Sequence, residues 1–174
     1  MTHPAKITLV LGGARSGKST HAQKLAEQGW QHPLYLATAE TLDQEMVERV
    51  QLHRTQRGPK WGCVEEPLDL ARVIQTPMPK RDGILIDCAT LWLTNVLLQE
   101  GEPAVQTRKK ELITALRTSP CDVIIVSNEV GMGIVPDSAL GRTFRDLQGW
   151  LNQDLAAIAD EVLFVIAGIP LKIK

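Results

Sequence analysis

Short apolar runs alternate with amphipathic stretches along the whole chain. The apolar runs have the length and composition of buried strands, and they cover residues 7–11, 33–38, 83–87, 122–127 and 161–167. A further short strand fits residues 63–65. Polar stretches with apolar residues three or four positions apart predict helices at 19–28, 43–57, 68–75, 88–99, 104–118 and 137–158. This alternation is typical of an α/β fold in three layers, with a mostly parallel sheet between helices on both of its faces.

The helix predicted at 137–158 has the clearest apolar stripe. Its apolar residues fit packing either on the sheet or at a subunit interface, and they are Leu140, Phe144, Leu147, Leu151, Leu155 and Ile158. The run 161–167 is expected to be the final strand, followed by a short Lys-bearing tail. At 174 residues the chain has the size of one domain, so we expect residues 1–174 to share one fold.

Composition and charge exclude several classes of function. The chain has 19 basic and 20 acidic residues without a long run of either sign, so no nucleic acid partner is expected. The cysteines lack the spacing of a zinc site or a disulfide framework, which predicts reduced thiols in a cytoplasmic protein at Cys63, Cys88 and Cys121. The start of the chain lacks the apolar segment of a signal peptide, and no run approaches the ~18 apolar residues of a membrane span. We therefore expect a soluble protein.

The first apolar run leads directly into a phosphate-binding motif. The motif fits G-x-x-x-x-G-K-[ST] at every fixed position, and its residues are Gly12, Gly13, Ala14, Arg15, Ser16, Gly17, Lys18 and Ser19. Glycines let the backbone turn so that successive N–H groups face phosphate oxygens, and the next helix adds its positive N-terminal end. Lys18 is placed to reach the β- and γ-phosphates, and the Ser19 hydroxyl to coordinate Mg²⁺. A Gly-rich turn that arose by chance is the alternative, but the complete motif behind a strand favours a nucleoside triphosphate with Mg²⁺.

A carboxylate ends the buried run 83–87. Asp87 stands where P-loop NTPases carry a second acid for the metal, and we expect its strand to neighbour that of the phosphate loop. The structural alternative is a strand-end Asp that only caps a turn. Together with Ser19, Asp87 would supply two protein ligands for Mg²⁺, and water and phosphate oxygens would complete the shell.

His53 is the candidate nucleophile. It falls near the end of predicted helix 43–57, among Arg49, Arg54 and Arg57. A neutral imidazole can attack phosphorus to form a phosphoramidate, and cationic neighbours both favour the neutral form and neutralise the developing charge. The alternative is a structural or exposed histidine, which is our interpretation of His3, His21 and His32.

Polar residues at other strand ends are weaker candidates. Strand-end residues near a nucleotide can bind ribose or base, but loop acids are usually only solvated, and this applies to Glu65, Asn128 and Glu129. The loop after run 33–38 also leaves the carboxyl end of a strand, where ligands bind in open α/β sheets. The guanine-recognising pattern [NT]-K-x-D of Ras-like GTPases is absent from the sequence.

Longer segments carry a resemblance to a known family. They are GGARSGKS, LYLATAE, MVERVQLHRTQRGPKW, SNEVGMGIVPDSALGRTFRDLQGWLNQDLAAIADEV and the terminal KIK. Over nearly its whole length, the chain resembles the bifunctional adenosylcobinamide kinase / adenosylcobinamide-phosphate guanylyltransferase family of cobalamin biosynthesis. The resemblance implies a RecA-like P-loop NTPase fold, a homotrimer, and Mg²⁺ with GTP or ATP.

The resemblance implies two reactions. In the first, the γ-phosphate of ATP or GTP passes to the aminopropanol hydroxyl of adenosylcobinamide. In the second, GTP gives its GMP to a histidine and releases pyrophosphate, and GMP then passes to adenosylcobinamide phosphate to form adenosylcobinamide-GDP.

The resemblance also implies site residues. The family's guanylylated histidine stands in an R-[IV]-x-x-H-[RK] context, which matches Arg49 to Arg54 and makes His53 the nucleophile. The implied nucleotide contacts are Gly12 to Ser19, Ala37, Thr38, Ala39, Arg54, Thr55, Gln56, Arg57, Glu65 and Asp87. The chain departs from the family pattern at three positions. Many relatives have Arg-Pro where Gly58 here separates Arg57 from Pro59. Some relatives have a second histidine at the position of Leu52 and Glu at the position of Asp87.

Two other functions fit the phosphate loop by itself. One is a kinase for cobinamide or another small alcohol, in which His53 has no role. The other is a nucleotide-dependent switch that hydrolyses NTP to change partners, although the sequence contains no recognisable arginine finger or effector segment. The base of the kinase step is also open, because neither Asp87 nor Glu129 stands out and a loose transition state needs little help from a base.

Overall fold

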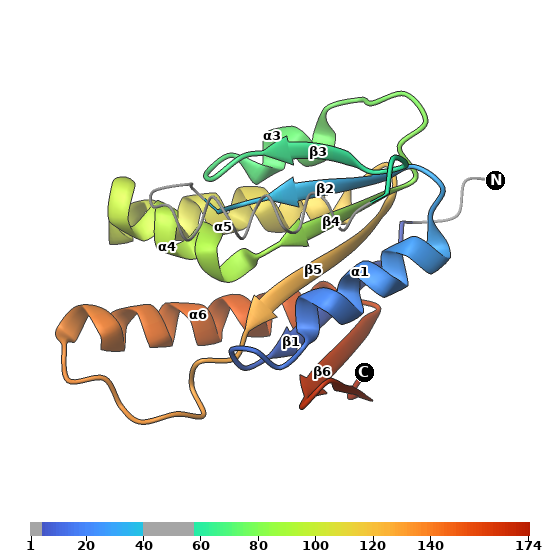
Figure 1. Cartoon of the computed structure of the whole chain (residues 1–174). Coiled ribbons are helices and arrows are strands. Elements are labelled where there is room, and N and C mark those ends of the chain that lie inside the picture. Colours follow the sequence, from blue (N-terminus) through green and yellow to red (C-terminus); the bar gives the residue numbers. More distant parts are fainter. Residues whose placement is uncertain (1–4, 40–57) are drawn as a thin grey trace.

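A computed structural model describes residues 5–39 and 58–174, which form a seven-stranded sheet with flanking helices (Figure 1). The strand order is β3-β2-β4-β5-β1-β6-β7. The strands are β1 (Ile7–Gly12), β2 (Pro33–Ala37), β3 (Gly62–Glu65), β4 (Gly83–Asp87), β5 (Asp122–Asn128), β6 (Glu161–Ile166) and β7 (Ile169–Lys172). Neighbours from β3 to β6 are parallel, whereas β6 and β7 are antiparallel. The predicted mostly parallel sheet is therefore confirmed.

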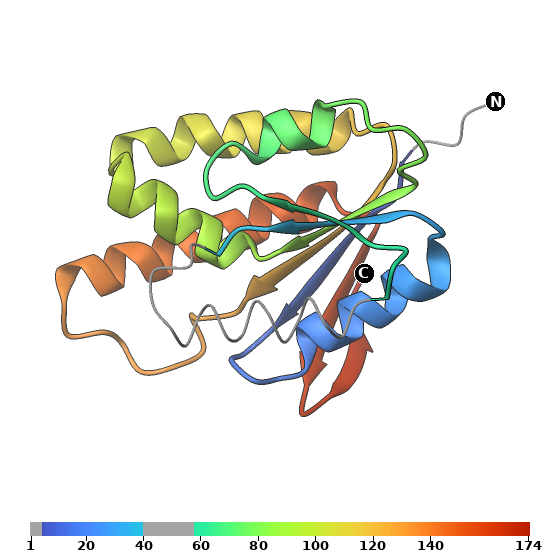
Figure 2. The ribbon, with the colours of Figure 1, turned by 45° about the horizontal axis from the view of Figure 1, so that its top comes forward.

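Helices cover both faces of this sheet. They are α1 (Lys18–Gly29), α3 (Leu70–Gln75), α4 (Ala89–Gln99), α5 (Glu102–Arg117) and α6 (Ala139–Ile158). Figure 2 shows α1 on one side of the sheet and α3, α4 and α5 on the other. Ala22 of α1 packs with Val10 in one core cluster, whereas Trp92 of α4 and Leu155 of α6 belong to the larger cluster on the opposite face. The predicted three-layer P-loop NTPase architecture is confirmed.

The central strands are buried on both faces, which explains their continuous apolar sequences. Every residue of β1 is buried. Leu9 and Leu11 face the larger core cluster and Val10 faces the α1 side, in the alternation that strand geometry requires. The parallel strands all end at the same edge of the sheet, which we call the carboxyl edge; the opposite one is the amino edge. Ligands of open α/β sheets bind at the carboxyl edge.

Side-chain caps determine where two helices begin. Asp69 accepts a hydrogen bond from the Arg72 N–H, so α3 begins at Leu70 rather than at the predicted residue 68. Ser138 caps α6 by accepting a hydrogen bond from the Gly141 N–H. The helix predicted at 43–57 lies outside the described residues.

The C-terminal end of the chain corrects a prediction. A final strand followed by a tail is wrong, because β6 ends at Ile166 and the chain turns at Ala167 and Gly168 to return as β7. Both turn residues have positive φ, 50° and 80°, as a tight two-residue hairpin requires. β7 is exposed throughout and contains Pro170, so it shows neither the burial nor the alternation by which a pattern reveals a strand.

The apolar stripe of α6 packs in the core over only part of the helix. Leu147, Leu151 and Leu155 are buried, whereas Leu140 in the first turn is 54% exposed. Among the helices that the structure describes, none combines the length and the apolar character needed to cross a membrane.

Candidate nucleotide-binding site

The phosphate loop connects β1 to α1 at the carboxyl edge. β1 ends at Gly12 and α1 begins at Lys18. The motif residues from Arg15 to Ser19, together with the next residue, Thr20, line a depression of about 280 Å³. A Cβ at Gly12 would lie 2.5 Å from Ser16 Oγ and 2.7 Å from the Val165 carbonyl oxygen, so a side chain cannot fit there. Gly17 has a φ of +91°, which glycine adopts without strain. Sterics thus explain why both fixed positions of the motif, 12 and 17, carry glycine.

Lys18 points back into its own loop. Its Nζ donates a hydrogen bond to the Gly13 carbonyl oxygen at 3.1 Å. Burial lowers the pKa of the Lys18 amine from its ordinary value, and the negative charge of Asp87 opposes that shift. A partly desolvated ammonium that bonds a carbonyl oxygen is well suited to exchange that partner for a phosphate oxygen.

Ser19 and Asp87 meet as predicted, although by a different route. β5 separates β1 from β4, so the expectation that the strand of Asp87 neighbours that of the phosphate loop is wrong. The Ser19 hydroxyl nevertheless donates to Asp87 Oδ1 at 3.3 Å, because α1 carries Ser19 across β5. The Tyr35 hydroxyl donates to the other carboxylate oxygen, Oδ2, at 3.0 Å. A hydroxyl and an oriented carboxylate are hard oxygen ligands, so this pair fits Mg²⁺.

Thr38, which follows β2, holds the backbone of Cys88, the residue after Asp87. Thr38 is buried, and its hydroxyl bonds both the carbonyl oxygen and the N–H of Cys88 at 2.8 Å. Asn95 of α4 donates to the Thr38 carbonyl oxygen at 2.8 Å. Burial, followed by the charge of Asp87, raises the pKa of the Cys88 thiol to about 11, so this thiol stays protonated and is a poor nucleophile. Among the predicted nucleotide contacts at the end of β2, Ala37 and Thr38 are buried and Ala39 is half-buried.

Other predicted residues lie farther away or outside the described part. Glu65 is exposed at the end of edge strand β3, four strand spacings, or roughly 19 Å, from the strand of the phosphate loop. A nucleotide whose phosphates lie on the loop could reach Glu65 only with its base or ribose. The predicted residues His53, Arg54, Thr55, Gln56 and Arg57 lie outside the described residues, and their roles stay predictions.

The Glu129 side chain bonds the backbone of its own loop. Its carboxylate accepts a hydrogen bond from the Gly131 N–H at 2.6 Å and thus caps the loop that follows β5. Its backbone N–H donates to the Gly12 carbonyl oxygen at 3.1 Å, which ties this loop to the phosphate loop.

A buried polar network at the end of β5 escaped the sequence analysis. The Ser127 hydroxyl donates to Asn152 Oδ1 at 2.7 Å and accepts from Gln148 Nε2 at 2.9 Å. Gln148 and Asn152 are four residues apart on the buried face of α6. That spacing was a signal in the sequence, because two amides interrupt an otherwise apolar stripe.

The hairpin between β6 and β7 also escaped prediction. The Gly168 N–H donates to the Ser16 carbonyl oxygen at 2.7 Å, and a Cβ on Gly17 would lie 3.2 Å from the Gly168 Cα. The turn between β6 and β7 therefore contacts the phosphate loop and supports it.

Comparison with known proteins identifies the family of the chain. Residues 8–173 match the model of the family described as cobinamide kinase / cobinamide phosphate guanyltransferase. The chain belongs to this family. The match runs from the phosphate-loop strand to the C-terminal hairpin, so it includes both of the features that meet at Ser16.

Three relatives are similar over nearly their whole length. The bifunctional adenosylcobalamin biosynthesis protein CobU of Salmonella typhimurium is 43% identical over 181 residues, covering 97% of this chain and 99% of the relative. Its namesake from Escherichia coli is 42% identical with the same coverage. The bifunctional adenosylcobalamin biosynthesis protein CobP of Pseudomonas aeruginosa is 41% identical over 166 residues, covering 95% of this chain and 96% of the relative.

Proposed function

We propose that this chain phosphorylates the aminopropanol hydroxyl of adenosylcobinamide and then attaches GMP to the product. The observation that carries the proposal is the phosphate loop with Ser19 against Asp87, in a member of the cobinamide kinase / cobinamide phosphate guanyltransferase family. A fold alone supports many functions. Here the loop accounts for the triphosphate, and family membership supports the acceptor.

In the kinase step, the loop from Gly13 to Lys18 holds the β- and γ-phosphates of ATP or GTP. Ser19 and Asp87 would hold Mg²⁺, which neutralises charge on the β- and γ-phosphates when bound. The alcohol oxygen forms a bond to the γ-phosphorus. The bond between the γ-phosphorus and the β–γ bridging oxygen breaks, and the nucleoside diphosphate leaves. Lys18 stabilises the charge that develops on the phosphates.

In the second step, His53 would be the nucleophile. Its ring nitrogen forms a bond to the α-phosphorus of GTP, and pyrophosphate leaves. A phosphate oxygen of adenosylcobinamide phosphate then attacks the same phosphorus, so that the P–N bond breaks and adenosylcobinamide-GDP forms. The contacts predicted at Ala37 to Ala39, Arg54 to Arg57 and Glu65 belong to this proposal. Support for it comes from the predicted position of His53 among arginines, which favour the neutral nucleophile.

We also propose that the chain forms a cytoplasmic homotrimer whose small-molecule substrates are GTP or ATP and adenosylcobinamide or its phosphate. The free thiols of Cys63, Cys88 and Cys121 are consistent with a reducing compartment. Exposed apolar side chains surround a hollow of about 340 Å³ between α4 and α6, among them Leu98 and Leu140. Such a surface supports contact with a second copy. Light scattering would detect a particle of about three times the mass of the 19.2 kDa chain.

Intact-protein mass spectrometry tests the central claim. Wild type and His53→Ala are incubated with GTP and Mg²⁺, and phosphorylation of adenosylcobinamide by ATP is measured in parallel. We expect the wild type alone to gain one GMP, and the variant to retain phosphoryl transfer because the kinase step does not use the imidazole.

Each other outcome identifies a different function. A protein that gains no GMP but phosphorylates adenosylcobinamide is a kinase only. Loss of both activities in a folded His53→Ala variant means that His53 binds substrate rather than reacts. Hydrolysis that a macromolecule stimulates, without transfer to a small acceptor, indicates a nucleotide-dependent switch.

A further inference from the structure

Asn128 lies between the two parts of the metal-triphosphate site. It is the last residue of β5, and β5 runs between β1, which leads to the phosphate loop, and β4, which ends in Asp87. In the β1–β5 register, Asn128 is opposite Gly12. Val126 packs on the α1 side and the Ser127 side chain bonds residues of α6 on the other side. Alternation along the strand therefore places the Asn128 side chain on the α1 side, with the phosphate loop and Asp87.

Buried side chains from two helices hold the Asn128 backbone. Its N–H donates to Thr90 Oγ1 of α4 at 2.8 Å, and its carbonyl oxygen accepts from Asn152 Nδ2 of α6 at 3.0 Å. Ser127 links the two helices, because its hydroxyl donates to Asn152 and lies 3.5 Å from the Thr90 hydroxyl. A residue fixed in this way is pre-organised, as positioning of a reacting group requires.

The side-chain oxygen of Asn128 is buried without a hydrogen-bond partner in the described part of the chain. Leaving a buried acceptor unpaired is unfavourable, so the position favours a ligand that brings a donor. The phosphates of an ionised nucleotide carry no hydrogen to donate. An alcohol acceptor does, and so do the waters around a bound Mg²⁺.

We infer that Asn128 Oδ1 accepts a hydrogen bond from the acceptor hydroxyl in the kinase step. This inference rests on the proposed function, and it assigns a residue that orients the alcohol oxygen toward the γ-phosphorus. The amide is not a base. The hydroxyl proton stays on the oxygen until the O–P bond forms and the bond to the leaving diphosphate breaks, and it then passes to water, as a loose transition state allows.

The test compares Asn128→Ala with Asn152→Ala, which weakens the clamp but keeps the acceptor oxygen of Asn128. Three rates are measured with the purified full chain: phosphoryl transfer from ATP to adenosylcobinamide, hydrolysis of ATP to water, and incorporation of GMP from GTP into the protein. We expect Asn128→Ala to reduce kcat for phosphoryl transfer by about 10- to 100-fold with KM for ATP within about twofold, because an oriented acceptor is lost while the triphosphate site stays. More ADP should form per phosphorylated acceptor, and GMP incorporation, which uses no alcohol, should change by less than about threefold.

The control separates orientation from stability. Asn152→Ala should lower the thermal midpoint at least as much as Asn128→Ala does, yet lose less of the transfer rate and keep the ratio of ADP to phosphorylated acceptor closer to that of wild type. The inference is overturned if Asn128→Ala transfers phosphate at close to the wild-type rate, if it loses transfer and GMP incorporation equally, or if the two variants behave alike. A wild type that never phosphorylates adenosylcobinamide overturns the proposed function, and this inference with it.

Discussion

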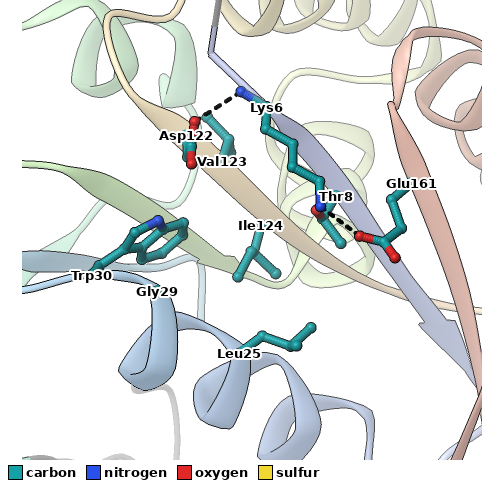
Figure 3. Close-up of a pocket in the computed structure, with 9 residues that line it drawn as sticks. All are labelled: Lys6, Thr8, Leu25, Gly29, Trp30, Asp122, Val123, Ile124 and Glu161. Carbon is teal, nitrogen blue, oxygen red and sulfur yellow. Dashed lines mark hydrogen bonds and ion pairs between the residues drawn. The ribbon is translucent and has the colours of Figure 1, made fainter. Parts of the chain in front are cut away.

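The two edges of the sheet both carry charged residues, but only one has the features of a site. At the amino edge, a hollow of about 160 Å³ is lined by Lys6, Asp122, Glu161 and six other residues (Figure 3). Each of its three charged side chains has a partner. Lys6 Nζ forms an ion pair with Glu161 at 2.7 Å, and the Lys6 backbone N–H donates to the Asp122 carboxylate at 2.8 Å. These two contacts tie the start of β1 to β6 and β5.

The carboxyl edge is different because its polar groups are left incompletely paired. Four buried side-chain polar atoms lack a partner in the described residues, and three of them belong to Ser16, Asn128 and Gln148 at this edge; the fourth is Trp61 Nε1. Within the described residues, Lys18 bonds a carbonyl oxygen, whereas Lys6 forms an ion pair with Glu161. Charge alone therefore does not distinguish a site in this fold. Unsatisfied groups at the ends of parallel strands do.

Removing the amine of Lys18 should have the largest effect. We expect Lys18→Ala to reduce both phosphoryl transfer and GMP incorporation by at least about 100-fold, because a cation that stabilises the reacting phosphates is lost. Lys6→Ala is the matched control at the amino edge and should keep both rates within about twofold. Normal GMP incorporation in Lys18→Ala would show that the two reactions use separate triphosphate sites.

Disturbing the C-terminal turn should have an intermediate effect. Gly168 has a φ of +80°, so alanine there should cost about 1 kcal/mol of unfolding free energy. Gly101, at the start of α5, combines a φ of 85° with a ψ of 165°, a conformation essentially restricted to glycine, so alanine there should cost about 1 to 3 kcal/mol. Only Gly168 touches the phosphate loop. Gly168→Ala should therefore raise KM for the nucleotide about three- to tenfold, whereas Gly101→Ala should not. Equal KM values in both variants would mean that the hairpin does not position the loop.

Breaking an ion pair at the amino edge should have the smallest effect. Glu161 pairs with both Lys6 and Lys172, and Glu161→Gln should lose about 0.5 kcal/mol of unfolding free energy at pH 7 and no activity, because these lysines are 54% and 65% exposed and solvent screens both pairs. The hydrogen bond from Lys6 lowers the pKa of Glu161 in the folded state, so the stabilisation is present above the ordinary carboxyl pKa of about 4.3 and is lost as the pH falls through the lower folded value. Urea unfolding at pH 7 and in acid should therefore show a difference between wild type and variant that shrinks in acid. A difference that grows in acid would contradict this account.

Elements that depend on neighbouring residues were predicted best. The phosphate loop, the buried strands and the ends of α1 and α4 follow from runs of neighbouring residues, and the structure agrees with them. Asp87 lies beside Ser19 as expected, although its strand does not neighbour that of the phosphate loop. The two residues are close because the carboxyl ends of all parallel strands meet at one edge, whatever their order. Their joint binding of Mg²⁺ stays a prediction.

The misses involve residues that are far apart in the chain. The Ser127 hydroxyl bonds Asn152, which is 25 positions later in the chain, and the Gly168 N–H near the C-terminus bonds Ser16 near the N-terminus. The periodicity of apolar and polar residues shows which face of an element is buried, but it does not show which distant residue that face will contact. The exposed strand β7 was missed for a related reason, since nothing is buried on either of its faces.

The sequence by itself determined the α/β architecture, the phosphate loop and membership of a family, because each depends on residues close together in the chain or on similarity along its length. Only the tertiary structure decided that β5 lies between Gly12 and Asp87, that Asn128 has a buried oxygen without a partner among the described residues, and that Gly168 supports the loop. These are properties of strand order and of long-range hydrogen bonds. They exist only when distant segments pack together and remove polar groups from water.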